Sequence, residues 1–326
     1  MSKIADWDDH IGRRLRLRDL RVFFAVVHAG SLARAAVQLR VSQPAVSQVI
    51  AELEHALGVK LFDRSRRGVQ PTVYARALLA RGRAAFDELK QGIKDIDFLA
   101  DPTSGELTIG FTVSIAATVL PHMIERFSEK YPRTVMNVDL VPSPAAKFPG
   151  LRDRTYDLIL ARMPSPLPDD YSVDGLNMEV LSDDPLVVVA GMQSPWARRR
   201  KIDLAELIDE PWILSPPDSW VYARVAEAFK ARGLELPKPR LVTYAMDLRT
   251  KLPTRGRFIS VVPNSLLCLG DDPPALKKLP VEMPVRPWLL TILTLKGRTL
   301  SPVVERFIEC AREVAKEFAP PARGRT

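Results

Sequence analysis

Between Leu17 and Gly58, apolar positions recur every three or four residues, which is the period of amphipathic helices. Three consecutive segments show this pattern, with the apolar residues Leu20, Phe23, Phe24 and Val27; Leu32, Ala35, Ala36 and Leu39; and Val46, Ile50, Leu53 and Leu57. Gly30 follows the first segment as a helix stop, and Ser31 and Ser42 stand where N-caps are expected. Pro44 falls in a first turn, where its missing N–H is harmless. The pattern predicts three helices, the last two joined by a tight turn.

The third helix has small or polar residues opposite its apolar stripe, namely Gln43, Ser47, Gln48 and Ala51. Groups of this kind suit contact with base edges in a major groove. Two short amphipathic helices with serine caps also occur in helical domains that never meet DNA. The helices alone therefore leave both interpretations open.

The segment after these helices favours DNA binding. Residues 60–72 predict a small hairpin with Leu61, Phe62 and Val69 facing inward, and its outward positions carry Lys60, Arg64, Arg66 and Arg67. A basic wing beside a recognition helix contacts phosphate. We therefore predict a winged helix-turn-helix domain over residues 17–71, preceded by an N-terminal extension over 1–16 that is either a solvated tail or an arm reaching phosphate.

Residues 72–100 contain no proline and keep a heptad spacing at Leu79, Gly82, Phe86, Leu89, Ile93, Ile96 and Ala100. A helix of this length extends roughly 40 Å, too far for a small winged domain to cover. We expect its stripe to pack on the same helix of a second subunit. The alternative is a long helix that lies across the chain's own C-terminal domain.

After Asp101–Gly105 the period changes, and short apolar strands alternate with helices to the C-terminus. This alternation is typical of an α/β domain with parallel sheets. Pro-rich connections at 163–170 and 271–274 divide the domain into two lobes. We predict an effector domain over 105–319, with lobe 1 at 105–163 and 275–319, lobe 2 at 170–270, a tail at 320–326, and a ligand cleft at the hinge.

The composition indicates the kind of partner and the cellular compartment. Residues 1–100 hold 17 Lys and Arg against 11 Asp and Glu, so most of the net charge of +8 lies in the N-terminal part, which suggests a polyanion partner. The sequence has no apolar run of membrane-spanning length and no signal peptide, so we expect a cytoplasmic protein without a membrane partner. Cys268 and Cys310, the two cysteines, are expected to be buried free thiols. No residue spacing suggests a metal or another cofactor.

These residues carry a resemblance to a family. The chain resembles the LysR-type transcriptional regulators over almost its whole length, on Leu20-Arg21-Val22-Phe23, Gly30-Ser31, Ala35-Ala36, Val41-Ser42-Gln43-Pro44-Ala45-Val46-Ser47 and Leu57-Gly58-Val59-Lys60-Leu61-Phe62-Asp63-Arg64. Weaker matches follow at Leu120-Pro121, Tyr131-Pro132 and Tyr156-Asp157-Leu158. The resemblance implies an α/β protein with an N-terminal winged helix-turn-helix, a long dimerisation helix and a two-lobed effector domain like that of periplasmic binding proteins.

It also implies partners: an interrupted palindrome in double-stranded DNA, RNA polymerase, a small inducer, and further copies of the chain in a dimer of dimers. The DNA-contact positions that it implies are Ser31, Arg34, Ser42, Gln43, Pro44, Ser47, Gln48, Arg64, Arg66 and Arg67. For the effector it implies Thr112 and Ser114, after the first strand of the effector domain. Their positions in the lobes add Ser143, Arg162, Ser215 and Tyr244 as candidates that line the cleft.

Gln48 departs from the family, which often has Arg or Lys there. Glutamine is a good bidentate partner of adenine, so we expect a shifted operator preference. The sequence leaves the effector open among organic acids, aromatic acids and sugars, and it identifies neither the target genes nor activation or repression. An enzyme is disfavoured because no nucleophile elbow, phosphate loop or zinc motif occurs. A non-specific architectural DNA binder would not need a large, nearly neutral second domain.

Overall fold

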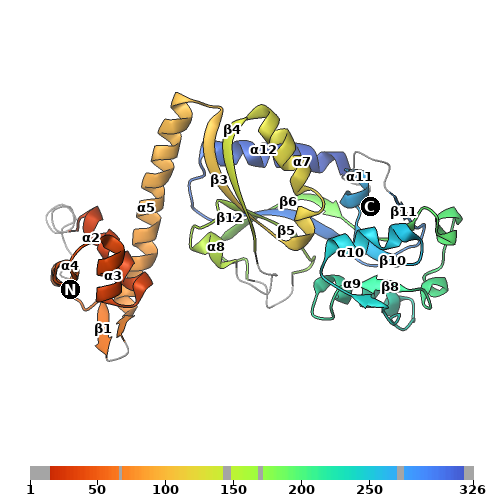
Figure 1. Ribbon diagram of the computed structural model, residues 1–326, viewed down its shortest axis with the longest axis horizontal. Coiled ribbons are helices and arrows are strands. Elements are labelled where there is room, and N and C mark those ends of the chain that lie inside the picture. Colours follow the sequence, from red (N-terminus) through yellow and green to blue (C-terminus); the bar gives the residue numbers. More distant parts are fainter. Residues whose placement is uncertain (1–14, 66–67, 142–147, 168–171, 270–274, 319–326) are drawn as a thin grey trace. The chain divides into compact units, whose positions relative to one another are not determined.

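The computed structural model describes residues 15–65, 68–141, 148–167, 172–269 and 275–318 (Figure 1). The chain forms two compact units, one that ends at Lys90 and one that begins at Gln91. The boundary lies inside helix α5 (Val73–Ala100), so the linker predicted over 72–100 is divided between the two units.

The first unit contains the three predicted helices and the predicted hairpin. Their bounds are α2 (Leu17–Ala29), α3 (Leu32–Leu39), α4 (Gln43–Leu57), β1 (Phe62–Ser65) and β2 (Gly68–Pro71). The two strands pair antiparallel, with Phe62 opposite Pro71 and Arg64 opposite Val69. The apolar stripes of the helices meet in one core, in which Phe23, Val26 and Ile50 are fully buried. Hydrophobic burial therefore fixes α4 against α2 and α3.

The two predicted serine caps differ. The Ser42 hydroxyl accepts a hydrogen bond from the Ala45 N–H at 3.3 Å and so caps α4. Ser31 occupies the N-cap position of α3, but its side chain accepts no capping bond, so this part of the prediction is wrong. Gly30 ends α2 with φ +60°, as expected for a glycine stop.

Helix α5 changes character along its length. Its first half packs within the first unit, where the Phe86 and Phe24 rings lie edge to face with centroids 5.4 Å apart. A Cβ at Gly82 would lie 2.8 Å from the Phe24 ring, which explains a glycine inside the helix. The later stripe positions Leu89, Ile93 and Ile96 are between 51% and 67% exposed. The described residues leave this half of the stripe uncovered.

Lobe 1 of the second unit is built on a sheet with the strand order β4-β3-β5-β12-β6. The strands are β3 (Ser104–Phe111), β4 (Arg133–Leu140), β5 (Leu158–Met163), β6 (Leu176–Asp184) and β12 (Trp288–Leu295). β3 runs parallel to β4 and β5, whereas β12 is antiparallel to β5 and β6. The predicted parallel pairing is therefore confirmed for β3, β4 and β5, whereas β12 makes the sheet mixed. The chain passes through lobe 2 before it forms β12. β12 is therefore not joined to β5 or β6 by the crossover connection that two parallel strands require.

Helices cover both faces of this sheet. Helices α7 (Leu120–Lys130) and α12 (Pro302–Phe318) pack on the face that carries Leu158 and Leu160, and α8 (Pro149–Arg152) packs on the face that carries Ile159 (Figure 1). Between β3 and β4 the chain forms two helices, α6 (Val113–Ala116) and α7. Pro121 stands in the first turn of α7, where it suits a helix start and not a helix interior.

Lobe 2 has a mixed sheet with the strand order β11-β7-β10-β8-β9. Its strands are β7 (Leu186–Gly191), β8 (Trp212–Leu214), β9 (Leu241–Val242), β10 (Ile259–Pro263) and β11 (Leu276–Lys278). Its helices are α9 (Trp220–Ala231), α10 (Met246–Lys251) and α11 (Ser265–Cys268), with 3₁₀ turns at η2 (Pro195–Arg198), η3 (Leu204–Leu207) and η4 (Pro253–Arg255). β7 and β10 are buried along their whole length, as continuous apolar runs require.

Two sequence predictions need correction here. Because β6 pairs with β12, residues 176–184 belong to lobe 1, so lobe 2 begins near Pro185 and not at residue 170. Because β11 pairs with β7, residues 276–278 belong to lobe 2. The prediction of two buried thiols is also wrong for Cys268, which is exposed at the end of α11; Cys310 is buried in the lobe 1 core.

Candidate functional site

Helix α4 presents a polar surface opposite its buried stripe. Gln43, Pro44 and Gln48 are exposed, and Ser47 is half-buried. These four side chains carry no charge, and Ser42 fixes the start of the helix through its capping bond. This face can therefore approach another surface closely without first displacing a salt bridge.

Gln48 is held by a neighbour on the same face. Its Nε2 atom donates to the Glu52 carboxylate at 3.0 Å, one helical turn later. This bond orients the amide of Gln48 and uses one of its two amide hydrogens. The pair presents acceptor groups and one remaining amide hydrogen, an arrangement that base edges can complement.

A buried carboxylate joins α4 to the wing. Glu54 Oε1 accepts the backbone N–H groups of Leu61 at 2.9 Å and Phe62 at 3.3 Å, and its Oε2 accepts Lys60 Nζ at 2.7 Å. Burial by itself would raise the pKa of Glu54, but these hydrogen bonds hold the pKa below its usual value. The ionised side chain thus fixes the hairpin relative to the helix.

The other predicted DNA residues lie around α4. Arg34 is exposed on α3, and Ser31 is half-buried at the start of that helix. Arg64 belongs to β1. Arg66 and Arg67 lie outside the described residues.

The second unit contains a cavity of about 100 Å³ whose walls come from both lobes, which we call the interlobe cavity. Lobe 1 contributes the residue after β3, the start of α6, the residue after β4, the end of β5 and the start of β12, with the residues Thr112, Val113, Ser114, Val141, Arg162 and Trp288. Lobe 2 contributes Ser215, Ser219, Trp220, Val221, Tyr244, Met246 and Arg249. The five predicted effector residues that are described, Thr112, Ser114, Arg162, Ser215 and Tyr244, all line this one cavity. Ser143 lies outside the described residues.

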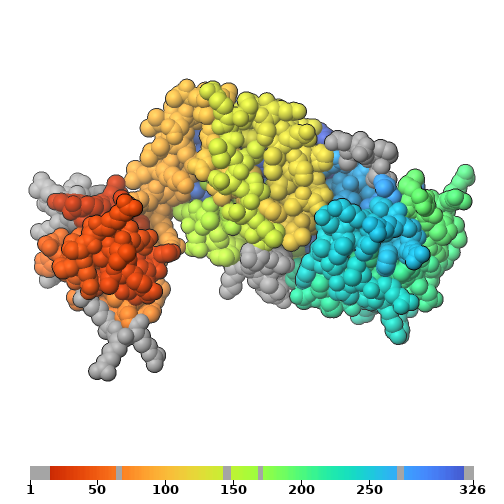
Figure 2. Space-filling model, viewed as in Figure 1, coloured from red at the N-terminus to blue at the C-terminus, as the bar shows by residue number. Residues whose placement is uncertain are grey.

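Helix α9 connects the two lobes beside the cavity. Trp220, in its first turn, packs on a lobe 1 cluster that includes Ile159 and Met163. Arg224 donates from Nη2 to the carbonyl of Ser165, after β5, at 3.3 Å. Figure 2 shows the yellow atoms of lobe 1 and the cyan atoms of lobe 2 in contact on this face. Movement of one lobe against the other would therefore change the cavity.

Each of the three guanidinium nitrogens of Arg162 donates a hydrogen bond within the protein. Its Nε and Nη2 atoms lie 2.8 and 2.6 Å from Asp184 Oδ2, and Nη2 also donates to the hydroxyls of Thr118 at 2.8 Å and Ser265 at 2.9 Å. Nη1 donates to the Ser114 carbonyl at 2.8 Å. Asp184 ends β6 of lobe 1, and Ser265 opens α11, which follows β10 of lobe 2. Arg162 therefore joins residues of both lobes, and its charge is balanced by Asp184.

Arg249 is buried differently. It is 3% exposed on α10, and its Nη1 atom donates to the Ser215 hydroxyl at 2.9 Å, while Nη2 donates to the Val261 carbonyl. Among the described residues no carboxylate pairs with it, and its Nε atom has no hydrogen-bond partner. Burial lowers the pKa of Arg249 to about 10. At neutral pH the cavity wall therefore holds a positive charge that the described part of the chain does not neutralise.

Other polar groups of the wall also lack partners. Thr112 Oγ1 and Trp288 Nε1 are buried without a hydrogen bond to any described residue. Buried polar atoms usually have partners, so unsatisfied atoms around one cavity indicate a place for a bound molecule. Tyr244 is 46% exposed, and its hydroxyl donates to Asp218 at 2.7 Å, a bond that raises the pKa of Tyr244.

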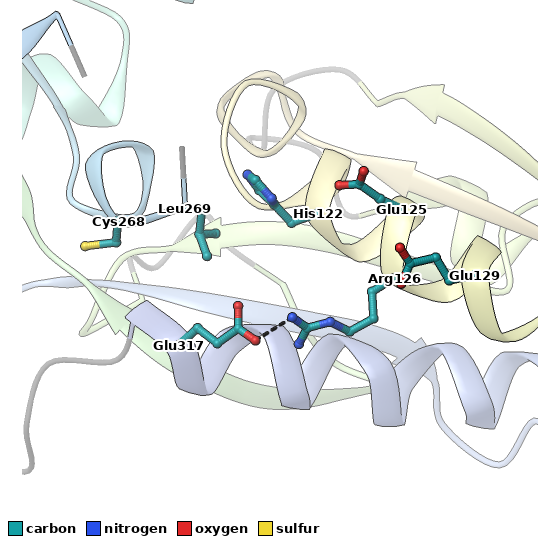
Figure 3. Close-up of a pocket in the computed structure, with 7 residues that line it drawn as sticks. All are labelled: His122, Glu125, Arg126, Glu129, Cys268, Leu269 and Glu317. Atoms are coloured by element: carbon teal, nitrogen blue, oxygen red, sulfur yellow. Dashed lines mark ion pairs between the residues drawn. The ribbon is translucent and has the colours of Figure 1, made fainter. Parts of the chain in front are cut away.

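A second hollow lies between α7, α11 and α12 (Figure 3). It is lined by His122, Glu125, Arg126, Glu129, Cys268, Leu269 and Glu317. The ion pair between Arg126 and Glu317 is drawn there as a dashed line, so the cationic group of this wall already has a partner. In the described part of the chain no cluster of His, Cys, Asp or Glu could hold a metal ion, and no helix is both long and apolar enough to cross a membrane.

Matches to known protein families cover both the α4 surface and the interlobe cavity. Residues 17–76 match the family model described as "Bacterial regulatory helix-turn-helix protein, lysR family", and residues 100–316 match "LysR substrate binding domain". The chain belongs to the LysR family of transcriptional regulators. This LysR-family chain thus has a helix-turn-helix DNA-binding domain that contains α4 and an effector-binding domain that contains the interlobe cavity.

Its relatives are transcriptional regulators. The chain is 30% identical over 239 residues to the HTH-type transcriptional regulator GbpR of Azospirillum brasilense. The matched residues cover 73% of this chain and 67% of GbpR. It is 28% identical over 299 residues to the transcriptional dual regulator GltC of Bacillus subtilis (strain 168), over 90% of this chain and 96% of GltC. These proteins are regulators and not enzymes, so the enzyme alternative is set aside.

Solved structures share the fold. A full-length OxyR variant from Pseudomonas aeruginosa has a TM-score of 0.62 and 21% sequence identity, with 96% of this chain and 99% of that chain covered. Full-length CbnR in complex with its target DNA has a TM-score of 0.52 and 24% identity, with 92% and 100% covered. The predicted class, a winged helix-turn-helix joined by a long helix to an α/β effector domain, is confirmed.

Eight of the thirteen residues of the cavity wall were not predicted from the sequence, among them Arg249, Trp220 and Trp288. Arg249 had a usable signal, because it stands three residues after Met246 and the two share the buried face of α10. A charged residue at a core-facing position is costly and therefore informative. The positions of the two tryptophans became recognisable only when the lobes were assembled.

Proposed function

We propose that this LysR-type regulator binds a promoter sequence through α4 and the wing, and that a small polar or anionic metabolite in the interlobe cavity changes this binding. The observation that carries the proposal is the cavity itself, where predicted contact residues from both lobes meet around unpartnered polar atoms. The candidate classes of effector are an organic acid, an aromatic acid and a sugar. No cofactor besides this effector is needed.

On the DNA side, Gln43, Pro44, Ser47 and Gln48 would face base edges. Ser31, Arg34 and Ser42 would contact the neighbouring backbone, together with Arg64, Arg66 and Arg67 of the wing. The exposed polar face of α4 supports this assignment. So does the similar fold of CbnR, which was solved on its target DNA.

The ligand would change DNA binding through the oligomer that several copies of the chain form. The uncovered stripe of α5 at Leu89, Ile93 and Ile96 supports pairing with a second copy, and a dimer of dimers would carry four winged domains. A ligand that prefers one arrangement of the lobes shifts the population of that arrangement. The spacing of the winged domains, the DNA bend and the contact with RNA polymerase would change with it.

The test measures binding of the full chain to DNA from upstream of its own gene by electrophoretic mobility shift, with and without metabolites selected by a thermal-shift screen. We expect a preference over random DNA that at least one stabilising metabolite alters. Thr112→Val should remove this response, because it deletes an unpartnered hydroxyl in the wall. Thr155→Val, at an exposed position outside the cavity, is the matched control. Equal affinity for random DNA would refute sequence-specific regulation.

A further inference from the structure

Arg249 gives the interlobe cavity a more specific ligand chemistry. We propose that the cavity binds a small monocarboxylate, with its carboxylate on the guanidinium of Arg249 and its apolar body against Trp220 and Trp288. This inference rests on the proposed function, since it names the class of effector that the cavity takes.

The charge of the wall is the first argument. Two arginines line the cavity, and no Asp, Glu or Lys lines it among the described residues. Arg162 is neutralised by Asp184 at 2.6 Å, which leaves Arg249 as the uncompensated charge of this wall. A buried guanidinium without a counter-ion is costly, and a ligand carboxylate supplies the missing partner. One unbalanced cation favours a ligand with one negative charge.

The geometry of Arg249 is the second argument. The side chain is fixed from two strands, by the Ser215 hydroxyl after β8 and by the Val261 carbonyl in β10. These bonds use one N–H of each terminal nitrogen, and arginine has five N–H donors. The Nε atom and the remaining terminal hydrogens are therefore left for a two-point contact with a carboxylate. A guanidinium that is already held in place loses little entropy when it binds.

The shape and polarity of the cavity are the third argument. Its volume of about 100 Å³ corresponds to roughly seven to ten water-sized positions, which suits a ligand with about as many non-hydrogen atoms. Much of its wall is apolar, from Trp220, Trp288, Val113, Val141 and Met246. Flat apolar groups pack well on indole rings. Thr112 Oγ1 and Trp288 Nε1 remain as polar contacts for a substituent.

A neutral sugar fits this wall less well. A hexose presents hydroxyl groups in every direction and would need many polar partners, whereas the described wall offers few beyond Thr112, Ser114 and Ser219. A sugar would also leave Arg249 without its counter-charge. The carboxylate class therefore agrees better with the residues present.

The experiment measures binding of benzoate, benzamide, acetate and D-glucose to the full chain by isothermal titration calorimetry. Benzoate and benzamide have nearly the same shape and differ in charge, whereas acetate lacks the apolar body. We expect benzoate to bind at least about tenfold more tightly than benzamide, as a charge-assisted hydrogen bond allows. Acetate and D-glucose should bind more weakly than benzoate.

Two variants assign the charge. Arg249→Met should lower the affinity for benzoate by about tenfold or more and leave that for benzamide nearly unchanged. Arg257→Met is the matched control, because Arg257 is an exposed arginine of the same lobe outside the cavity. If Arg249→Met does not fold, Arg249→Lys keeps the charge without the planar fork and should lose part of the preference for benzoate over benzamide.

Equal binding of benzoate and benzamide, tighter binding of D-glucose, or no binding of any carboxylate would overturn the monocarboxylate proposal. So would an Arg249→Met variant that binds benzoate as the Arg257→Met control does. The proposed function has a separate readout, which is the affinity of the same protein for its upstream DNA. If benzoate binds through Arg249 and leaves DNA binding unchanged, the ligand class stands and the regulatory proposal fails.

Discussion

Replacement of Arg249 by methionine should have an unusual effect on the stability of the ligand-free protein. Desolvation lowers the pKa of this side chain from the usual arginine value to about 10. At about 1.4 kcal/mol for each tenfold change in the equilibrium, holding the charge in this place costs roughly 3 kcal/mol at neutral pH. Methionine fills a similar volume and carries no charge.

Part of that gain is lost with the hydrogen bonds. Arg249 donates to Ser215 and Val261, and each bond contributes about 1 kcal/mol. The variant should therefore lie between equal stability and a gain of about 2 kcal/mol. For a unit of this size that is a rise in Tm of up to about 6 °C in the transition of the effector domain. Most substitutions of buried residues act in the opposite direction.

Differential scanning calorimetry of the ligand-free full chain and of Arg249→Met measures this difference, with Arg257→Met as the control. The pH dependence has a defined sign. Because the folded pKa lies below the unfolded value, the wild-type protein gains stability as the pH rises above about 10, and the advantage of the variant should shrink there. A loss of more than about 1 kcal/mol in the variant at neutral pH would show that the charge is well compensated, and would refute this reasoning.

Three further substitutions test other parts of the molecule. Ile96→Glu places a charge in the uncovered stripe of α5 and should shift the protein toward monomer in light scattering, whereas Lys90→Glu on the same helix should not. Gln48→Ala should weaken discrimination at one base pair of the operator by about 1 to 3 kcal/mol, read from binding to a panel of substituted sites; a uniform loss over all sites would contradict a role in base recognition. Ser42→Ala should cost about 1 kcal/mol in thermal unfolding because it removes a real cap, and Ser31→Ala, which removes none, should cost clearly less.

The elements of the first unit could be predicted because each local signal agreed with the final packing. Apolar spacing, a glycine stop and a proline in the first turn all indicated the helices that form. The Ser31 cap failed because a suitable residue at the N-cap position does not ensure that its hydroxyl turns toward the helix. Only one of the two serines makes the bond.

Prediction was weaker where pairing is non-local. β6 is buried at only three of its nine positions and ends in Ser182, Asp183 and Asp184, so it lacks the continuous buried run of β5 and β7. β6 lies at the edge of the lobe 1 sheet, which explains this composition. Because β6 was not recognised as a strand of lobe 1, the start of lobe 2 was predicted too early in the sequence. The antiparallel direction of β12 was likewise invisible in the residues of that strand.

The candidate effector residues show the same division. Thr112, Ser114, Arg162, Ser215 and Tyr244 could be named from strand ends and the family resemblance, and they line one cavity. The sequence could not show which of the cavity residues carries a charge available to a ligand, because this depends on which side chains form ion pairs within the protein. Arg162 finds Asp184, whereas Arg249 finds no carboxylate among the described residues.

The most direct test of ligand-responsive, sequence-specific regulation is the affinity of the full chain for DNA from upstream of its own gene, measured by fluorescence anisotropy against random DNA of equal length at fixed salt. We expect a preference of about a thousandfold or more, and a change in this preference when benzoate fills the interlobe cavity. Equal affinities for the two DNA fragments at every salt concentration would contradict sequence-specific regulation. A preference that no cavity ligand alters would contradict the regulatory role of the cavity.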